Sequence, residues 1–418
     1  MKHILSFLLI ASLAIFYSCS ETGNNGDNTI IDVESATGSG KIRNASDFIK
    51  EIKYIPLETS PNSMIGNIRK VIVLNEKIFV SDDKNTLNIF DMEGRHLNTL
   101  NRAGRGPEEY LNLNSFDVGA DGTIYISSQN QGIVFYDSHF KFIKTALPKE
   151  DRNAGFVDLM LLKEGLFSSN KYKFDFSGGN HEQNWNIYND SLETLFSYST
   201  SSSTETESNS GGGVAIAMRL TPYRQYLYKD LLTIHRPGND TIFNIDYKNS
   251  YSKSARYIIN TGKYHFSEEM DKPIEGAPAD LEAISLDNVA ETDNYLFLSF
   301  NFRGVAPEAF DKEGNYAVIN GRRVDMGGNR NTDVYAVFEK RNGKLSILKQ
   351  PIPQSLGLKN DINGGAMFWP KAVTDNYDLI SWHNALDLVL LAEEGRIDRG
   401  VIGNLKEDDN PVIVIATM

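Results

Sequence analysis

The feature of this sequence that most constrains its fold is a repeated pair of short strands joined by a polar turn. The stretches "KIFVSDDKNTLNIFD" and "TIYISSQNQGIVFYD" both alternate apolar and polar residues with the period of a β-strand. Phe79 and Asp91 in the first stretch stand as far apart as Tyr125 and Asp137 in the second, and the two units are offset by 46 residues. Helical periodicity is nearly absent, so the pattern predicts an all-β protein.

Further copies of the unit extend this prediction to most of the chain. The same spacing between an apolar residue and an aspartate recurs from Ile234 to Asp246, and a looser fourth copy of the unit spans Val334–Pro351. A repeat of this length, made of short strands, is typical of the blade of a β-propeller, because one small sheet buries both of its faces only by packing against neighbouring sheets around a ring. We therefore predict that residues 43–418 form a six-bladed β-propeller, with seven or eight blades as alternatives.

The two ends of this domain carry a predicted closure of the ring. "EIKYIPLETS" (Glu51–Ser60) is a strand before the first full repeat, and "NPVIVIATM" (Asn410–Met418) is a strand at the terminus. If both join one sheet, the open edge of the ring disappears. The low-complexity stretch at 197–213 is predicted to be an inserted loop.

The first residues are typical of an export signal. A short positive start precedes the apolar run Ile4–Phe16, which is too short to span a bilayer. Ser18 then precedes Cys19, the one cysteine of the chain. We predict a lipoprotein signal peptide over residues 1–18 and a lipid on Cys19, with an ordinary secretory signal as the alternative. The polar residues 19–42 are predicted to be a flexible tether.

Composition excludes two classes of function. The formal net charge of −13 argues against nucleic acid as a partner, because phosphate binding needs a basic face. Once Cys19 carries lipid, no thiol is left for a disulfide or for a cysteine-ligated metal. The membrane, reached through the anchor, and an envelope protein or a glycan are the partners that we expect. The expected location is the cell envelope, anchored to the outer membrane, on a side that the sequence does not decide.

The glycine-rich stretch "NRAGRGPEEY" could hold a phosphate or connect two blades. A phosphate loop needs glycines that open a helix, and here Pro107 and a strand-like segment follow them. We predict a connection between blades, in which Gly104 and Gly106 adopt unusual backbone dihedrals and Glu109 and Tyr110 anchor the loop against the next blade. Such connections approach the axial face of a propeller, so Arg102, Arg105 and Glu109 are also candidates for the wall of a binding pocket.

The histidines and one tryptophan complete the candidate residues. No two histidines have a metal-binding spacing, so no metal site and no cofactor are predicted. His235 and His383 lie at strand ends and are the histidines that we expect nearest to an axial pocket. Trp369 in "AMFWPKAV" either stacks on a sugar ring or covers the edge of a sheet. No catalytic motif is readable from spacing along the chain.

Several motifs resemble a known family. "YIPLETSPNSMIGNIRKV", the Arg-x-Gly-x-Gly-Pro-x-Glu-Tyr element, "NDTIFNID" and the closing "EDDNPVIVIATM" are similar to the six-bladed β-propeller lipoproteins of Bacteroidetes, a group of NHL-like propellers. The resemblance covers nearly the whole mature chain and implies the fold. It implies less about activity, because the wider group includes binding platforms, lyases and calcium-dependent hydrolases.

These observations favour a lipid-anchored, non-enzymatic propeller that binds a protein or glycan partner on one axial face. The alternative is a hydrolase or lyase that uses acids and histidines gathered at the axis, with or without calcium. A purely structural role in an envelope assembly stays open. A cluster of titratable side chains at the axis would favour chemistry, whereas an apolar rim would favour recognition.

Overall fold

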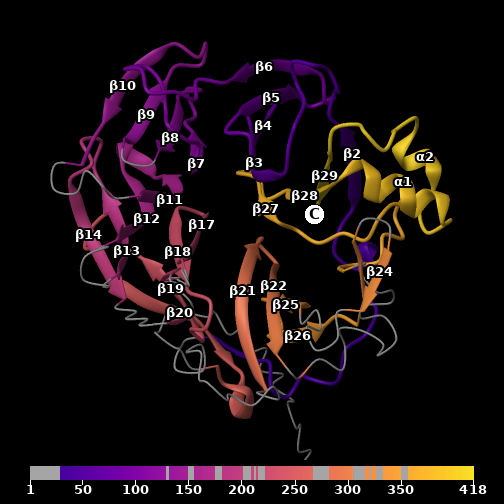
Figure 1. Cartoon of the computed structure of the whole chain (residues 1–418). Coiled ribbons are helices and arrows are strands. Elements are labelled where there is room, and N and C mark those ends of the chain that lie inside the picture. The colour runs from indigo at the N-terminus through magenta and orange to yellow at the C-terminus, as the bar shows by residue number, and fades with distance from the viewer. Residues whose placement is uncertain are drawn as a thin grey trace, which may run out of the picture.

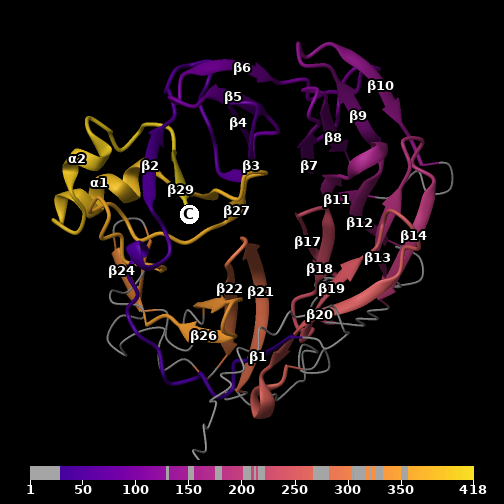
Figure 2. The same cartoon turned by 180° about the vertical axis from the view of Figure 1, so that it is seen from behind.

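The computed structural model describes residues 29–128, 131–148, 155–174, 181–200, 209–210, 213–214, 222–266, 282–303, 305, 316–319, 322–325, 333–349 and 356–418. In these residues, six small sheets stand around a central axis (Figure 1, and from behind in Figure 2). The prediction of a six-bladed β-propeller is confirmed, and seven or eight blades are excluded.

The first three blades follow one another along the chain, each with its strands in sequence order. Blade 1 consists of β3 (Ile68–Leu74), β4 (Lys77–Asp82), β5 (Leu87–Asp91) and β6 (His96–Leu100). Blade 2 consists of β7 (Ser115–Val118), β8 (Ile124–Ser128), β9 (Gly132–Tyr136) and β10 (Phe142–Ala146). Blade 3 consists of β11 (Gly155–Leu161), β12 (Phe167–Phe174), β13 (His181–Tyr188) and β14 (Thr194–Thr200).

The last three blades contain the exceptions to this order. Blade 4 consists of β17 (Arg224–Tyr228), β18 (Leu231–His235), β19 (Thr241–Ile245), β20 (Lys253–Asn260) and an added β1 (Thr29–Asp32). Blade 5 consists of β21 (Ala283–Glu291), β22 (Tyr295–Arg303), β25 (Asp333–Glu339) and β26 (Lys344–Ile347). Blade 6 consists of β27 (Ala372–Val373), β28 (Leu379–His383), β29 (Val412–Thr417) and β2 (Glu51–Pro56).

The first strand of each blade faces the axis. β3, β7, β11, β17, β21 and β27 surround the centre in Figure 1, and neighbouring first strands contact one another, as β7 and β11 do. Because consecutive strands are antiparallel, the turns between first and second strands lie at one end of the axis. The connections from one blade to the next lie at the other end, which we call the connection end.

An aspartate begins the turn after the third strand in blade 1 and in blade 2. Asp91 Oδ1 accepts hydrogen bonds from the backbone N–H groups of Glu93 and Arg95, 3.0 and 2.9 Å away. Asp137 Oδ1 does the same for His139 and Lys141, both at 2.9 Å. An aspartate at the start of such a turn satisfies backbone donors that the strand ladder leaves free.

The predicted closure of the ring is confirmed. β2 pairs with β29 in antiparallel register from Glu51–Thr417 to Pro56–Val412. Buried Asn410, next to β29, accepts a hydrogen bond from the backbone N–H of Ile65 at 2.9 Å. Its Nδ2 donates to the carbonyl oxygens of Glu58 and Ser63, 2.8 and 2.7 Å away. Segments from opposite ends of the chain are thus fastened both by the strand ladder and by one buried amide.

The segment assigned to a tether differs from the expectation after residue 28. Thr29–Asp32 forms β1, which pairs in parallel with β20 and extends blade 4 to five strands. Ile31 and Val33 are fully buried in the core between blades 4 and 5. The short strand escaped sequence analysis because its apolar residues find their partners more than two hundred residues away. The signal peptide, Cys19 and the start of the tether lie outside the described residues.

Two further expectations are corrected in position. The looser fourth repeat, Val334–Pro351, covers β25 and β26, the third and fourth strands of blade 5, whereas the other copies cover second and third strands. The insertion predicted at 197–213 begins later, because β14 continues to Thr200. Of its remainder, the structure describes only β15 (Asn209–Ser210) and the start of β16 (Gly213–Val214), which pair with each other.

Helical structure was not expected, yet two helices interrupt blade 6. α1 (Ala385–Glu393) and α2 (Arg399–Ile402) stand in the connection between β28 and β29 and bury Leu388, Val389 and Ile402. Outside the blades, β23 (Tyr316–Ile319) pairs with β24 (Arg322–Asp325). None of the described helices is long and apolar enough to cross a membrane.

Candidate axial binding site

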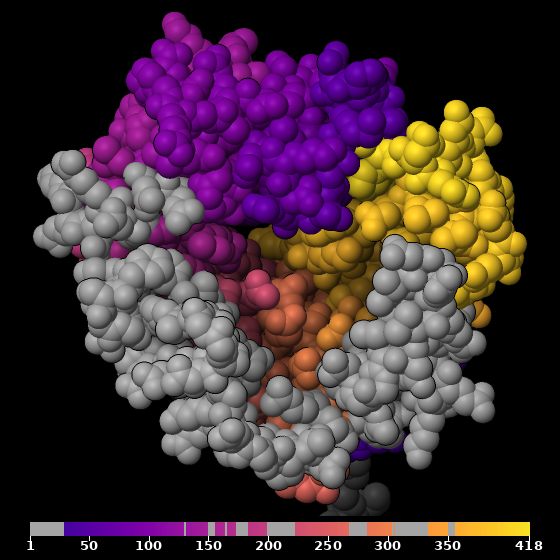
Figure 3. Space-filling model, in the orientation of Figure 1, coloured from indigo at the N-terminus to yellow at the C-terminus, as the bar shows by residue number. Residues whose placement is uncertain are grey.

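Charged side chains gather on the innermost strands of five blades. They are Lys70, Asp117, Asp158, Arg224 and Asp287, which we call the axial column. All five keep part of their surface exposed, although an innermost strand in a closed ring borders solvent only along the axis. The face in Figure 3 is hollowed near its centre, where the axis meets the surface. The column is therefore accessible to water.

Local irregularities of the strands accompany three of these residues. The pairing of β3 shifts between Ile68 and Lys70, and that of β21 shifts between Leu286 and Asn288, around Asp287. β11 is irregular between Val157 and Met160, and Asp158 has a φ of 58°, in the left-handed region. Bulges of this kind re-aim a side chain that regular alternation would direct elsewhere. Strain at Asp158 is the type of strain found at functional sites.

Lys70 connects three blades. Its Nζ donates to the carbonyl oxygen of Phe116 in blade 2 at 2.9 Å and to that of Leu159 in blade 3 at 3.0 Å. The ammonium group is thus held by the backbone of the next two innermost strands. It lies close enough to Asp117 and Asp158 to lower the pKa of both carboxyl groups.

Asp117 and Asp158 nevertheless have pKa values above the ordinary range. Burial against the surrounding strands raises the pKa of Asp117, and the backbone N–H groups of Leu161 and Val118, 2.6 and 2.8 Å away, offset part of this. Burial likewise raises the pKa of Asp158, and the charge of Asp117 adds to the increase. Two interacting carboxyl groups with raised pKa values are typical of functional sites.

The column continues toward the connection end. Arg224 forms an ion pair with Asp287, with 3.6 Å between Nη2 and Oδ1. His235 is fully buried behind this pair, and its Nε2 lies 3.2 Å from the carbonyl oxygen of Asp287. Burial lowers the pKa of His235 to about 4, so the imidazole is neutral at pH 7. Asp333 adds a further carboxylate close to Asp287.

The opposite end of the axis is bridged. Tyr377, in the first turn of blade 6, contacts the ring of Tyr228 in blade 4 at a centroid distance of 5.6 Å. Its hydroxyl accepts a hydrogen bond from the backbone N–H of Lys229 at 3.3 Å. Blades 4 and 6 are not neighbours in the ring, so this contact spans the axis. A ligand would therefore reach the column from the connection end.

The chemistry of the column suits a polar ligand. The carboxylates of the column accept hydrogen bonds, whereas Lys70 and Arg224 donate them. Acceptors and donors therefore lie close together along the axis. A pair of carboxyl groups with raised pKa values can also exchange protons with a substrate. No three His, Cys, Asp or Glu side chains of the described residues are grouped as a metal site would require. Calcium belongs only to the enzymatic alternative and stays an expectation of that alternative.

The stretch Arg102–Tyr110 connects β6 with β7. Buried Tyr110 donates through its hydroxyl to the carbonyl oxygens of Asn85 and Leu100, 2.9 and 3.2 Å away, and so ties the connection to blade 1. Glu109 accepts a hydrogen bond from the backbone N–H of Gly106 at 2.7 Å. The sequence predicted that both side chains anchor the loop against the next blade. The Tyr110 ring does contact Tyr136 in blade 2, but its hydroxyl bonds to blade 1, and the Glu109 side chain bonds within the connection itself.

The glycines of this stretch act through space rather than through backbone angles. Neither Gly104 nor Gly106 has a φ in the left-handed region, contrary to expectation. A Cβ at Gly104 would lie 2.0 Å from Oε2 of Glu109, so the carboxylate occupies the space that a side chain would need. Arg102 and Arg105 are exposed, and Arg102 lies 3.6 Å from Glu108. None of these residues contacts His235, which belongs to blade 4.

The remaining predicted residues are dispersed. His235 lies beside the axial column, but His383 lies at the end of β28 in blade 6, where burial lowers its pKa to about 4. Trp369 is 7% exposed, stacks on Tyr335 at 4.4 Å and donates to Ser299 Oγ at 2.9 Å. The tryptophan is therefore part of the core between blades 5 and 6, where it covers the sheet.

The axial column itself escaped sequence analysis. Each of its residues is a charge in a strand that is rich in apolar residues: Lys70 in "IRKVIVL", Asp117 in "SFDV", Asp158 in "GFVDLML", Arg224 in "RQYLY" and Asp287 in "AISLDNVAE". Buried strands rarely contain a charge without a partner. A charge in the innermost strand of successive repeats was thus the signal that could have revealed the site.

The fold and the column define the class of protein: a six-bladed β-propeller with a charged axial site. The chain belongs to the family described as "Domain of unknown function (DUF4934)", which matches residues 28–417. No curated protein matches the sequence.

Solved structures are similar in fold. A putative exported protein from Bacteroides fragilis has a TM-score of 0.60 and 15% identity, and the match covers 93% of this chain and 99% of that one. A member of the DUF4221 family from Bacteroides vulgatus has a TM-score of 0.50 and 11% identity, with 88% and 96% covered. At such identities the likeness shows the fold alone.

Proposed function

We propose that this protein is a binding module of the cell envelope that holds a polar partner, a protein or a glycan, at the axial column. The observation that carries the proposal is the water-accessible row of Lys70, Asp117, Asp158, Arg224 and Asp287 on five different blades. Five charges on innermost strands cost folding free energy, which a purely structural ring would avoid by using apolar residues there.

Access supports the same proposal. Tyr377 bridges one end of the axis, and the face in Figure 3 is hollowed near its centre, so we expect a partner to enter from the connection end. A recess lined by a few convergent polar groups is the usual form of a ligand site. A bound partner would meet Arg224 and Asp287 first and Asp158 behind them.

The direct test measures binding of residues 29–418 to fractionated envelope extract and to an array of polysaccharides. Arg224→Met and Asp158→Asn should each weaken any saturable binding about tenfold or more, because each leaves a charged partner without its complement. Arg341→Met, at an exposed turn far from the axis, is the matched control. Binding that both axial variants retain in full would contradict the proposal.

Lipid anchoring forms part of this proposal. We propose that Cys19 is acylated after removal of residues 1–18 and holds the propeller at the membrane. The sequence pattern of an apolar run followed by Ser18 and Cys19 supports it. Cys19→Ser should move the protein from the membrane fraction to the soluble fraction, and the lipid should be visible in the intact mass of the wild type. A wild-type protein without the added mass would contradict the anchor.

A second candidate function is acid/base catalysis on a polysaccharide by a hydrolase or lyase. The observation in its favour is the pair Asp117 and Asp158. Burial raises the pKa of both, the charge of Asp375 adds to the increase at Asp117, and the charge of Asp117 adds to the increase at Asp158. Protonated and ionised carboxyl groups side by side can act as acid and base. Reducing-sugar release and the absorbance of unsaturated products distinguish hydrolysis from elimination, and assays with calcium and with chelator test the metal. Activity that Asp158→Asn removes would establish this function.

A further inference from the structure

The direction of β1 fixes where the segment that carries Cys19 joins the propeller. β1 pairs in parallel with β20, and Asp32 lies opposite Asn260. The connection to blade 5 follows Asn260, so β20, and therefore β1, runs toward the connection end. The backbone N–H of Val33 donates to the carbonyl oxygen of Asn260 at 2.9 Å and holds this direction. The chain thus enters blade 4 at Thr29 from the side of the other end, which we call the turn end.

The segment between Cys19 and β1 is short. Ten residues, 19–28, precede Thr29 and span about 36 Å when fully extended. Thr29 lies opposite Tyr257, and residues 253–256 of β20 lie between this pair and the turn end, a distance of about 13 Å. A chain that continues along the line of β1 therefore passes the turn end of blade 4 with about 20 Å left to reach a lipid surface beyond it.

The turn end of blade 4 exposes leucines. Leu227 and Leu231 belong to the tip of the hairpin β17–β18, residues 227–231, which we call the hairpin tip, and they are 39% and 42% exposed. Leu227 pairs with Leu232, and Leu231 pairs with Tyr228, so the two exposed side chains point to opposite faces of the hairpin. Apolar side chains on both faces of a protrusion can insert among lipid headgroups, whereas a flat protein surface would cover one face only.

The charges at the hairpin tip are compensated. Lys229 Nζ lies 2.8 Å from Asp293 Oδ1. Asp230 Oδ2 lies 2.6 Å from Lys163 Nζ and 3.4 Å from Lys248 Nζ. Three lysines thus accompany two aspartates. This balance lowers the repulsion that a protein of net charge −13 meets at an anionic lipid surface.

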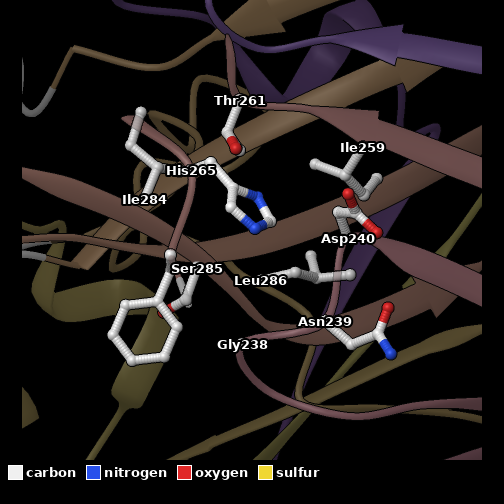
Figure 4. A pocket seen from close by; sticks show the side chains of 10 residues that line it. Gly238, Asn239, Asp240, Ile259, Thr261, His265, Ile284, Ser285 and Leu286 are labelled. Atoms are coloured by element: carbon white, nitrogen blue, oxygen red, sulfur yellow. The ribbon is translucent and has the colours of Figure 1, made fainter. Parts of the chain in front are cut away.

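The connection end of blade 4 has a different character. Figure 4 shows Asn239, Asp240 and His265 around a small recess at this end. The exposed side chains that the structure describes here are polar; they are Asp32, Arg224, Asn260, Lys263 and His265. In the described part of blade 4, exposed leucines therefore lie at the turn end only.

We propose that the turn end of blade 4, with its hairpin tip, lies on the membrane that holds the lipid of Cys19. This orientation rests on the lipid anchor proposed above and goes beyond it. The connection end then faces away from the membrane, so the axial column receives its partner from the aqueous side. The direction of β1 and the short segment 19–28 favour this face, and the exposed Leu227 and Leu231 favour it independently.

Fluorescence quenching in lipid vesicles tests the orientation on the full-length, acylated protein. Acylation of Cys19 leaves no free thiol, so one added cysteine takes the fluorophore alone. Asn249→Cys places the label at the turn end of blade 4, and Lys263→Cys places it at the connection end, both at exposed positions. Lipids with a nitroxide on the headgroup should quench the label at position 249 about threefold more strongly than the label at position 263.

A leucine pair tests the contribution of the hairpin tip. Leu227→Ser combined with Leu231→Ser should lower the quenching at position 249 about twofold, because the anchor alone then holds the propeller. Leu97→Ser combined with Leu111→Ser, at leucines that are 49% and 38% exposed outside blade 4, is the matched control and should change nothing. Equal thermal melting of all variants shows that they are folded.

The outcomes separate the orientation from the anchor. Equal quenching at positions 249 and 263, stronger quenching at position 263, or quenching that the hairpin-tip variant leaves unchanged would overturn the proposed orientation. Flotation of the wild type with vesicles is measured first, together with its intact mass. A wild type that neither floats nor carries lipid rejects the anchor itself, whereas flotation with equal quenching rejects the orientation alone.

Discussion

The Nζ atom of Lys70 lies 3.0 Å from the carbonyl oxygen of Leu159, although blade 2 separates the blades to which these residues belong. The same atom bonds to Phe116 in that intervening blade at 2.9 Å. One side chain thus joins three innermost strands. Apolar packing joins each blade only to its neighbours, so this contact adds a constraint of longer range to the ring.

Removal of the Lys70 ammonium group should weaken the contact between the first three blades and lower the stability of the protein. Lys70→Met keeps the length of the side chain but leaves two carbonyl oxygens without their charged donor, so we expect a loss of about 2–4 kcal/mol in the free energy of unfolding. Urea denaturation measures it. Lys77→Met, at an exposed position of β4, is the control and should change stability by less than about 0.5 kcal/mol. Equal stability of both variants would contradict this assignment.

The buried amide of Asn410 should contribute strongly to the stability of the closed ring, in addition to the pairing of β2 with β29. Asn410→Ala removes one acceptor and two donor interactions to the segment Glu58–Ile65, so we expect a loss of about 2–4 kcal/mol in unfolding free energy. Asn249→Ala, in an exposed turn where the side chain bonds to Asp246, should cost less than about 1 kcal/mol. Thermal unfolding followed by circular dichroism compares the two variants.

Alanine substitutions of the two neighbouring isoleucines of β1 should differ sharply in their effect on the free energy of unfolding. Ile31 is fully buried, whereas Ile30 is 63% exposed. Ile31→Ala should cost about 2–4 kcal/mol in unfolding free energy because it leaves a cavity between blades 4 and 5. Ile30→Ala should change it by less than about 0.5 kcal/mol. If both variants melt with the wild type, β1 does not contribute to the stability of the propeller.

Two histidines, fully buried His235 and half-buried His383, should make the protein less stable as the pH falls. Burial lowers the pKa of His235 and of His383 to about 4, below the ordinary value of about 6.5 in the unfolded chain. The unfolded chain therefore binds protons first, and stability that is complete above about pH 6.5 is lost as the pH falls toward 4. Each histidine can contribute about 3 kcal/mol to this loss.

The corresponding measurement compares urea denaturation at about pH 7 and about pH 4.5. His235→Gln removes the titrating group, so its loss of stability between these pH values should be about 2 kcal/mol smaller than that of the wild type. His383→Gln should act in the same direction, and the double variant should show the sum. Raised pKa values of buried aspartates act in the opposite direction, but they are common to all variants and cancel in the comparison.

Much of the fold was predictable because its determinants are local. The repeated step from Phe79 to Asp91 identified second and third strands, and the apolar terminal segments identified β2 and β29. Helix α1 was missed even though Leu388 and Val389 have helical spacing to Ala385. One helix of nine residues adds little helical periodicity to a sequence in which strand patterns dominate. β1 was missed because four residues in a polar segment reveal nothing of a partner as distant as Tyr257.

The axial column was not predictable as a site because no two of its members are close in sequence. Asp117 and Asp158 meet only after the ring has brought β7 and β11 together. His235 was singled out for its position at a strand end, and it does border the column. His383 occupies a similar strand end but packs elsewhere, because strand ends in different blades face different neighbours.

The pairing of β2 with β29 also has a consequence for how the chain matures. Residues such as Glu58 and Asn410, 352 positions apart, must meet before blade 6 exists. Contacts of such range are slow to form, because a long loop must close first. During synthesis, β2 therefore stays unpaired until β29 has been synthesised. A chain truncated by a few residues at this end would keep two unpaired sheet edges, which favour aggregation and proteolysis.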